Sequence, residues 1–220
     1  MRAAAIPESA SALQPAGTGE VRIRVVLAAV HPAGAAAGVV DALGEGVRGL
    51  EPGDRVWMWG EAEGIVGEYP VLPRSRVVRM RDGVPFEVGA VLAVPALTAY
   101  RRLTTAAGVP DRLAPGVLKG RTVLIADGAG PAGIAAIQLA EWAGATVLTT
   151  TGAQEEDAAD PAPGPDAVAA VAEAVDAGAL RVGEDAGLPI RRFPPERIAE
   201  AREAAGDHAA GAVVIEVTKP

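Results

Sequence analysis

A stretch of about 30 residues in the middle of the chain limits the possible folds more than any other feature. Thr122 to Ala126 and Thr146 to Thr150 are two short segments typical of β-strands. Between them, Gly130 to Ala143 is rich in Ala, Ile and Leu and long enough for a helix, which Gly144 would cap. Because a helical connection of this kind joins parallel strands, we predict a βαβ unit here.

The turn between the first strand and the helix carries the motif GxGxxG, with its glycines at Gly128, Gly130 and Gly133. In a dinucleotide-binding fold these glycines permit the tight turn, the approach of a pyrophosphate and the close packing of helix on strand. Free N–H groups at the helix N-terminus would hold the phosphates. The candidate cofactor-binding residues are therefore Gly128, Ala129, Gly130, Gly133 and Thr150, which ends the second strand. The alternative is that the glycines serve strand–helix packing alone.

The chain before about residue 85 is typical of a small β-barrel or sandwich. Val21 to Val30 has the apolar, β-branched character of a strand, and two further strand-like pieces lie between Val66 and Met80. In the segment LGEGV, Gly44 and Gly46 are predicted to adopt positive φ where two strands reverse direction.

Helical patterns follow this β-rich part. We predict a helix at Ala96 to Ala107, after an interruption at Pro95, because proline removes a backbone donor from a helix. A second helix is predicted at Asp166 to Ala177, with the Asp166 side chain as N-cap and Gly178 just after its end.

Composition excludes several classes of function. The formal net charge is −8, so there is no basic surplus for nucleic acid as the main partner. The chain has no cysteine and two histidines, and we therefore expect neither disulfides nor a metal site. It has no apolar run of the roughly 18 residues that a membrane span needs and no signal-peptide pattern, so we expect a cytoplasmic protein without membrane contact.

Four collinear segments carry a family resemblance. They are GVVDALGEGVRGLEPGDRVW from Gly38, PALTAYRRL from Pro95, VLIADGAGPAGIAAIQLAEWAGATVLTT from Val123, and the tail from Val168 to Val217. Together they resemble the quinone oxidoreductase branch of the medium-chain dehydrogenase/reductase superfamily, and the absence of cysteine fits its zinc-free members. The resemblance implies a GroES-like β-barrel domain and a Rossmann domain with NADPH bound between them.

The chain departs from the family pattern at several places. Only fifteen residues separate Thr150 from Asp166, where the family has about a hundred more, including the strands that line the nicotinamide half of the site. His31 replaces the family's asparagine before a proline, Asp127 takes the place of a small residue beside the pyrophosphate, and the segment Gln154 to Asp157 is acidic. We therefore predict an α/β plus β fold, with a β-barrel domain at 1–85 and 185–220 and a truncated Rossmann-like domain at 86–184. The cofactor is predicted to be either none or NADP.

Three functions are compatible with these departures. The main interpretation is a non-redox cyclase or isomerase that acts on a small apolar metabolite, such as an enone or a polyketide, in a cleft between the domains. Its candidate catalytic residues are His31, Tyr100 and Asp127. The first alternative is an NAD(P)H-dependent quinone or enoyl reductase, and the second is a binding protein without catalytic activity.

Loss of the later Rossmann strands also predicts how the chain assembles. The edge of the strand Thr122 to Ala126 would be left apolar and open. We therefore expect either a homodimer that pairs or packs the two reduced sheets, or a C-terminal strand rerouted to cover that edge.

Overall fold

The structure is a computed structural model, which describes residues 13–30, 34–60, 67–107, 112–126, 128–150, 163–206 and 211–218. The chain divides into two compact units. Unit 1 comprises Met1–Val91, Arg191–Asp207 and Ala212–Pro220, and unit 2 comprises Leu92–Ile190 and His208–Gly211. The boundaries between the two units thus fall after residues 91 and 190. The domain boundaries predicted from the sequence fall after residues 85 and 184.

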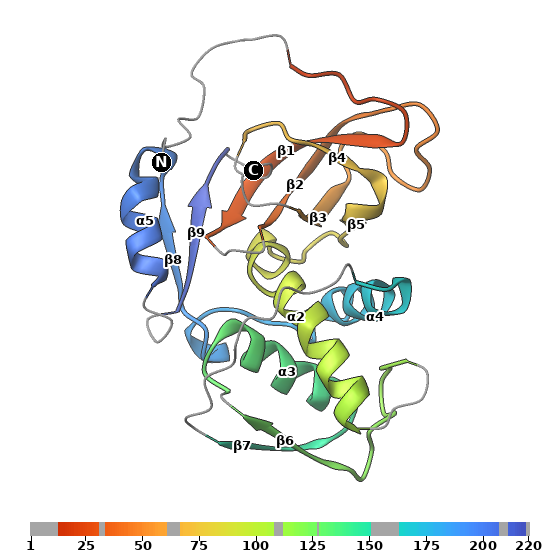
Figure 1. Ribbon diagram of the computed structural model, residues 1–220, viewed down its shortest axis with the longest axis vertical. Helices are drawn as coiled ribbons and strands as arrows, with labels where there is room; N and C mark the ends of the chain where they lie inside the picture. Colours follow the sequence, from red (N-terminus) through yellow and green to blue (C-terminus); the bar gives the residue numbers. More distant parts are fainter. Residues whose placement is uncertain are drawn as a thin grey trace. The chain divides into compact units, whose positions relative to one another are not determined.

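Unit 1 is built on a sheet in the spatial order β5-β3-β2-β1-β9-β8, with β4 also paired to β1 (Figure 1). The pairs from β5 through β9, and the pair of β4 with β1, are antiparallel. Its strands are β1 (Glu20–Ala29), β2 (Ala35–Leu43), β3 (Arg55–Trp59), β4 (Val71–Pro73), β5 (Val77–Arg79), β8 (Ile190–Phe193) and β9 (Ala212–Glu216). The two short pieces predicted between residues 66 and 80 are β4 and β5, whereas β8 was not predicted from the sequence.

The core of unit 1 follows from the alternation of side chains along its strands. Val21, Ile23 and Val25 of β1 point to one face and are fully buried, together with Met58 of β3. Burial of each such side chain stabilises the fold by roughly 1.5–3 kcal/mol relative to its exposed state. Helix α5 (Ile198–Ala205) adds the fully buried Ala201 to the same cluster.

Glycine is needed at the two positions of the LGEGV segment for different structural reasons. Gly46 has a φ of +80°, which confirms the predicted turn conformation. Gly44 does not belong to the positive-φ glycines, and that part of the prediction is wrong. A Cβ added at Gly44 would lie 1.6 Å from the carbonyl oxygen of Gly17, so glycine is needed there for close approach of two backbone segments.

Helix α2 (Phe86–Ala107) runs through Pro95, which corrects the predicted interruption at this residue. One end of α2 is fixed by β3: the Arg55 guanidinium lies 3.7 Å from the centre of the Phe86 ring, and a Cβ at Gly89 would lie 2.9 Å from the Cβ of Trp57. A single proline costs a helix one hydrogen bond, and tertiary packing of this kind can offset that loss.

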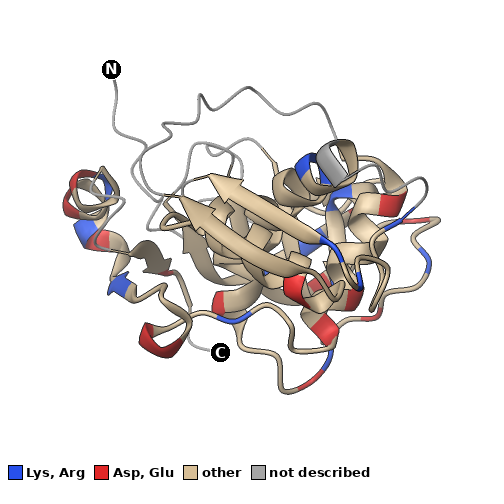
Figure 2. Ribbon diagram, turned by 90° about the horizontal axis from the view of Figure 1, so that it is seen from below, with Lys and Arg blue, Asp and Glu red and all other residues tan. Residues whose placement is uncertain are grey.

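Unit 2 contains the predicted βαβ unit: β6 (Thr122–Ala126), α3 (Pro131–Trp142) and β7 (Thr146–Thr150). The strands pair in parallel and in continuous register, and α3 contacts both (Figure 1). Ile125 is buried, whereas Leu124 and Leu148, which are register partners, are 65% and 55% exposed. Figure 2, which is seen from the side of these strands, shows no charged residue within either of them. The outer face of this small sheet is therefore uncharged, with two exposed leucines among exposed threonines.

Helix α4 (Pro165–Asp176) begins after Gly164, which is the N-cap, and no side chain caps this end. The predicted capping role of Asp166 is therefore wrong, because Pro165 already occupies the first helical position and Asp166 lies within the first turn. Gly178 has a φ of +68°, as expected for the residue after the helix end.

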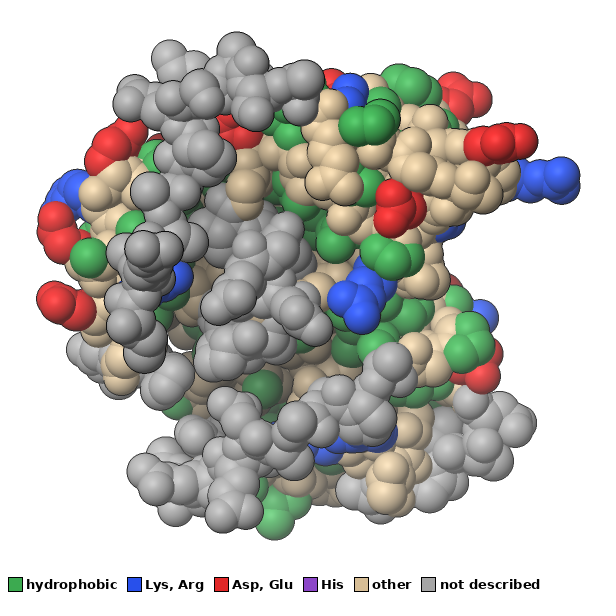
Figure 3. Space-filling model, turned by 45° about the horizontal axis from the view of Figure 1, so that its top comes forward, with side chains coloured by type: hydrophobic (Ala, Val, Ile, Leu, Met, Phe, Trp, Pro, Cys, Tyr) green, Lys and Arg blue, Asp and Glu red, His purple; other side chains and the backbone are tan. Residues whose placement is uncertain are grey.

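The C-terminal strand β9 pairs with β1 in unit 1. It does not cover the edge of β6, so that part of the assembly prediction is wrong. Within the described ranges, no helix is long and apolar enough to cross a bilayer. Among the side chains coloured in Figure 3, acidic and basic groups are interspersed on the face that is shown.

Candidate functional site

The glycine motif lies where the sequence places it, in the turn from β6 into α3. Gly130 is the N-cap of α3 in an extended conformation, with φ −85° and ψ 171°, and Pro131 occupies the first helical position. The carbonyl oxygen of Gly130 accepts the hydrogen bond of Ile134 N–H at 2.9 Å. The N–H groups of Ala132 and Gly133 come before that first intrahelical bond, so the helix leaves them free to bind an anion.

The three glycines of the motif occupy different environments. A Cβ added at Gly128 would lie 3.0 Å from Ile137 Cδ1 and 3.2 Å from Thr149 Cγ2, so this glycine allows close packing of the turn between α3 and β7. Gly133 is buried within the first turn of α3. A Cβ at Gly130 would meet no atom within 4 Å. Packing therefore explains Gly128, whereas the open space at Gly130 fits the approach of a phosphate group to the backbone.

Thr150 lies next to this turn. It ends β7 and is the register partner of Ala126, the last residue of β6. The carboxyl ends of the two parallel strands therefore meet at one edge of the sheet, which is where ligands bind in open α/β folds. The exposed side chain of Thr150 could donate a hydrogen bond to a ribose or phosphate at this edge.

Tyr100 lies elsewhere in unit 2, on α2, and is 7% exposed. Burial raises the pKa of its phenol above 10.0, and the negative charge of Asp166 acts in the same direction. A hydrogen bond with the backbone of Leu113 and the positive charge of Arg112 lower the pKa by smaller amounts. These contacts hold Tyr100 between α2, the segment around Leu113 and the start of α4.

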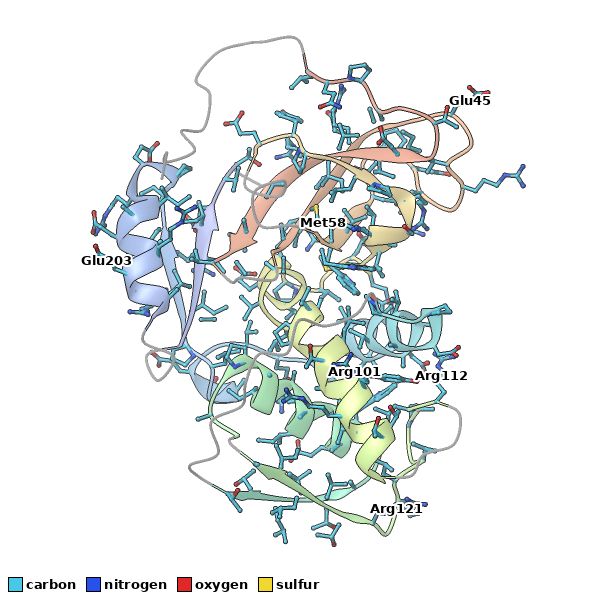
Figure 4. The ribbon with its side chains drawn as sticks, in the orientation of Figure 1. Glu45, Met58, Arg101, Arg112, Arg121 and Glu203 are labelled. Carbon is cyan, nitrogen blue, oxygen red and sulfur yellow. The ribbon has the colours of Figure 1, made fainter. Side chains whose placement is uncertain are left out.

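Arg112 belongs to the same neighbourhood. Its Nη2 donates to Glu173 Oε2 of α4 at 2.7 Å, and Figure 4 shows Arg112 beside that helix. The structure thus gives Tyr100 partners that fix helices and loops to one another.

His31 and Asp127, the other two candidate catalytic residues, lie outside the described residues. The structure therefore describes neither side chain. Within the described residues, no group of three or more His, Cys, Asp or Glu side chains is arranged to hold a metal ion.

The sheet that carries the glycine turn has only β6 and β7 among its described strands. In a full Rossmann fold, the first two strands and their turn hold the adenosine and pyrophosphate part of a dinucleotide, and further strands line the nicotinamide. The described geometry thus fits the first part of the cofactor and supplies no strand for the second.

Sequence comparison with known proteins gives two groups of relatives. Human quinone oxidoreductase is 32% identical over 124 residues, which cover 56% of this chain and 35% of that protein. The spectinabilin polyketide synthase system protein NorB of Streptomyces orinoci is 34% identical over 168 residues, 69% of this chain and 7% of that protein. The squalestatin hexaketide synthase clz14 of Cochliobolus lunatus is 36% identical over 117 residues, 53% of this chain and 4% of that protein. No family model matches the chain.

The chain belongs to the quinone oxidoreductase-like branch of the medium-chain dehydrogenase/reductase superfamily. Its fold is that of the superfamily, an α/β plus β fold with a GroES-like barrel and a reduced Rossmann domain. The Escherichia coli quinone oxidoreductase crystallised with NADPH has a TM-score of 0.68 at 15% identity, with 93% of each chain covered. The CurK enoyl reductase has a TM-score of 0.70 at 16% identity, also with 93% of each chain covered.

This quinone oxidoreductase-like chain spans about a third of the length of the quinone oxidoreductases it matches in sequence. No relative supports the predicted cyclase or the non-catalytic binding protein, and the comparisons favour the reductase alternative instead. Reasoning from the sequence also missed one residue that supports the site. Gln138 of α3 is buried, and its side chain binds both backbone groups of Arg181. A lone glutamine on an apolar helix face is the signal that could have revealed it.

Proposed function

We propose that this protein is an NADPH-dependent reductase of quinones or enones. The observation that carries the proposal is the open space at Gly130, at the N-terminus of α3, within a turn that has the spacing and strand–helix context of a dinucleotide site. The relatives named as quinone oxidoreductases and the solved enoyl reductase support the reaction type. The solved E. coli enzyme with NADPH supports the choice of cofactor.

The residues of the turn would share the binding of the cofactor's diphosphate. Ala132 and Gly133 present backbone N–H groups at the positive end of the α3 dipole, and Gly130 leaves room for phosphate oxygens. Thr150 lies at the adjacent end of β7, where it would contact a ribose or phosphate. Gly128 keeps the turn packed against Thr149, so these groups are held in position before a ligand arrives.

The reaction that this site would serve is a two-electron reduction. When bound, NADPH supplies a hydride to the quinone or to the β-carbon of the enone, and a proton from solvent completes the reduced product as NADP⁺ leaves. The chain's own contribution is to bind and orient the dinucleotide at the carboxyl edge of β6 and β7.

The test compares two glycines in similar backbone settings, of which only Gly130 lies at the proposed diphosphate site. Gly130 and Gly164 are both N-caps of 12-residue helices with proline at the first position, both have extended backbone, and neither has an atom within 4 Å of an added Cβ. An alanine is therefore tolerated by the fold at both positions. Only at Gly130 would its methyl group occupy the space proposed for the diphosphate.

We expect Gly130→Ala to weaken NADPH binding by tenfold or more in a calorimetric titration, and Gly164→Ala to leave it unchanged. At a concentration 100 times its dissociation constant, NADPH should stabilise the wild-type protein by about 2.7 kcal/mol. With a quinone or an enone added, the wild-type protein should oxidise NADPH, which is followed by the loss of absorbance at 340 nm.

Three results would overturn parts of this proposal. Absence of NADPH binding by the wild-type protein at millimolar concentration would reject the cofactor site. Equal loss of binding in both alanine variants would show that the turn is not where NADPH binds. Binding without oxidation in the presence of either acceptor would reject the reductase and favour a function without redox chemistry.

A further inference from the structure

We infer that unit 1 holds a small monovalent anion, of the size of a halide, between Arg55 and Trp57 of β3. The inference concerns a binding site within unit 1 and is independent of the proposed reaction. It rests on two buried N–H groups that have no acceptor in the described part of the chain.

Arg55 and Trp57 lie on the same face of β3. Side chains alternate along a strand, and Val56, which lies between them, belongs to the hydrophobic cluster on the other face. The Cα atoms of Arg55 and Trp57 are therefore roughly 6.6 Å apart along the strand. Both side chains point toward α2. The Arg55 guanidinium lies over the ring of Phe86, the first residue of that helix, and Gly89 of the same helix approaches Trp57.

Two hydrogen-bond donors on this face lack an acceptor. Trp57 is fully buried and its indole Nε1 has no partner, and the buried Nε of Arg55 has none either. Both groups can only donate, so neither can satisfy the other. Buried polar groups in folded proteins almost always have a hydrogen-bond partner. This pair of donors therefore indicates an acceptor that the described residues do not supply.

The charge at this place favours an anion over a neutral acceptor. Arg55 is partly buried, and it forms no ion pair with any described residue, because its Nη2 donates to the carbonyl oxygen of Val84 instead. The neighbouring carboxylate of Asp54 is paired with Arg79 at 3.1 Å. Since α2 begins at Phe86, the positive end of its dipole adds to the charge of Arg55. Buried charges are normally paired, so this cation requires a counterion.

Close packing around these donors limits the size of the anion. A Cβ added at Gly89 of α2 would lie 2.7 Å from Met80 Sδ and 2.9 Å from Trp57 Cβ, so helix and strand leave no room for a bulky group there. The ring of Trp59 lies beside that of Trp57, with 5.2 Å between the ring centres. The edges of aromatic rings carry partial positive charge, which is compatible with an anion. A halide fits this setting because it accepts hydrogen bonds from any direction and needs the space of one atom.

The test on the wild-type protein uses the full chain, with chloride and bromide as probes. Sodium chloride at ten times its dissociation constant should raise the thermal midpoint by about 3–6 °C over sodium gluconate at equal ionic strength, because the gluconate anion is too large for the site. The NMR line of chloride should broaden when the protein is added. In crystals soaked in bromide, an anomalous peak should lie within hydrogen-bonding distance of Trp57 Nε1 and Arg55 Nε.

Two tryptophan variants separate the site from general packing. Trp57→Phe keeps an aromatic ring and removes the N–H group, so we expect it to weaken chloride binding by tenfold or more. Trp59→Phe makes the same change in the neighbouring ring, whose nitrogen is not among the buried donors that lack an acceptor. This matched control should bind chloride as the wild-type protein does.

Two variants of Arg55 test the contribution of charge. Arg55→Lys keeps the positive charge and should bind chloride more tightly than Arg55→Met, which removes it. Gly130→Ala changes the proposed diphosphate site in unit 2 and should leave the response to chloride unchanged. The two proposals can therefore fail separately.

The wild-type measurements decide the inference even where a variant does not fold. Equal thermal midpoints in chloride and gluconate, together with an unbroadened chloride line, would overturn it and favour a buried water molecule as the acceptor. Equal weakening in the two tryptophan variants, or the absence of bromide between Arg55 and Trp57, would overturn the assignment to these residues.

Discussion

Gln138 links helix α3 to the segment that follows α4, and its replacement should destabilise unit 2. Its Nε2 donates to the carbonyl oxygen of Arg181 at 3.0 Å, and its Oε1 accepts the N–H of Arg181 at 2.8 Å. Gln138 is 7% exposed, and Leu139 and Ala135 of the same helix are fully buried. Both polar atoms of the Gln138 amide thus form hydrogen bonds with the backbone of Arg181.

The variant Gln138→Met keeps the length and most of the volume of the side chain and removes both hydrogen bonds. Each bond contributes about 1 kcal/mol net. The residue Arg181 is exposed, so water can reach its backbone once the amide is gone, and the larger penalty for a buried unsatisfied group does not apply in full. We therefore expect a loss of about 2 kcal/mol in the free energy of unfolding of unit 2.

Urea unfolding followed by fluorescence should show this loss as a midpoint lower by about 1 M, for a slope of roughly 2 kcal/mol/M. Amide hydrogen exchange in α3 should accelerate about 30-fold, since each 1.36 kcal/mol is a factor of ten. Glu141→Met, at an exposed position of the same helix, is the control and should change stability by less than about 0.5 kcal/mol. A change below 0.5 kcal/mol in Gln138→Met, or an equal change in the control, would refute the reasoning.

Three further substitutions follow from the contacts of single residues. Because burial raises the pKa of Tyr100, the folded state holds its proton more strongly than the unfolded state, so its contribution to stability is present below pH 10 and falls as the pH rises above 10. Tyr100→Phe should therefore cost about 1 kcal/mol at pH 8 and remove this decline from urea titrations at higher pH, and a decline that persists in the variant would contradict the assignment. Gly44→Ala should lower the free energy of unfolding by at least about 3 kcal/mol, because its methyl group would overlap a backbone oxygen. Gly46→Ala should lower it by about 1–2 kcal/mol, because this substitution only strains φ. Equal losses in thermal unfolding of the two variants would contradict this difference. Gly128→Ala should cost about 1 kcal/mol from contacts of 3.0 and 3.2 Å with α3 and β7, and no measurable loss would show that the turn relaxes freely.

The βαβ unit could be predicted almost to the residue because every local signal agrees there. Strand residues are β-branched or apolar, the helix is alanine-rich, and Gly144 ends it with a φ of +89°. The confirmed boundaries of β6 and β7 reflect this agreement. In contrast, the continuity of α2 through Pro95 depends on packing against β3, which is distant in sequence and gives no local signal.

The same limit applies to the capping residues. Asp166 is of a residue type that often caps helices, yet Pro165 is the first helical residue and the N-cap lies two residues before Asp166, at Gly164. Gly44 was predicted as a turn glycine, yet glycine is needed there because the backbone of Gly17, which lies 27 residues away in sequence (44 − 17), approaches it closely. Residue type indicates that a position is special, and the cause depends on tertiary neighbours that only the fold supplies.

The glycine turn illustrates why a motif needs the structure before it can support a function. Gly128 and Gly130 belong to one motif, and both are predicted from the sequence as cofactor-binding residues, with packing of strand and helix as the alternative. The structure separates the two roles: Gly128 is in contact with side chains of α3 and β7, so packing alone would retain it, whereas nothing within 4 Å of an added Cβ requires glycine at position 130. Gly130 also has extended backbone that any residue can adopt, so neither φ nor sterics explains it. A ligand that approaches the backbone at this point would explain the glycine, and this is why the proposed function depends on Gly130 and its comparison with Gly164.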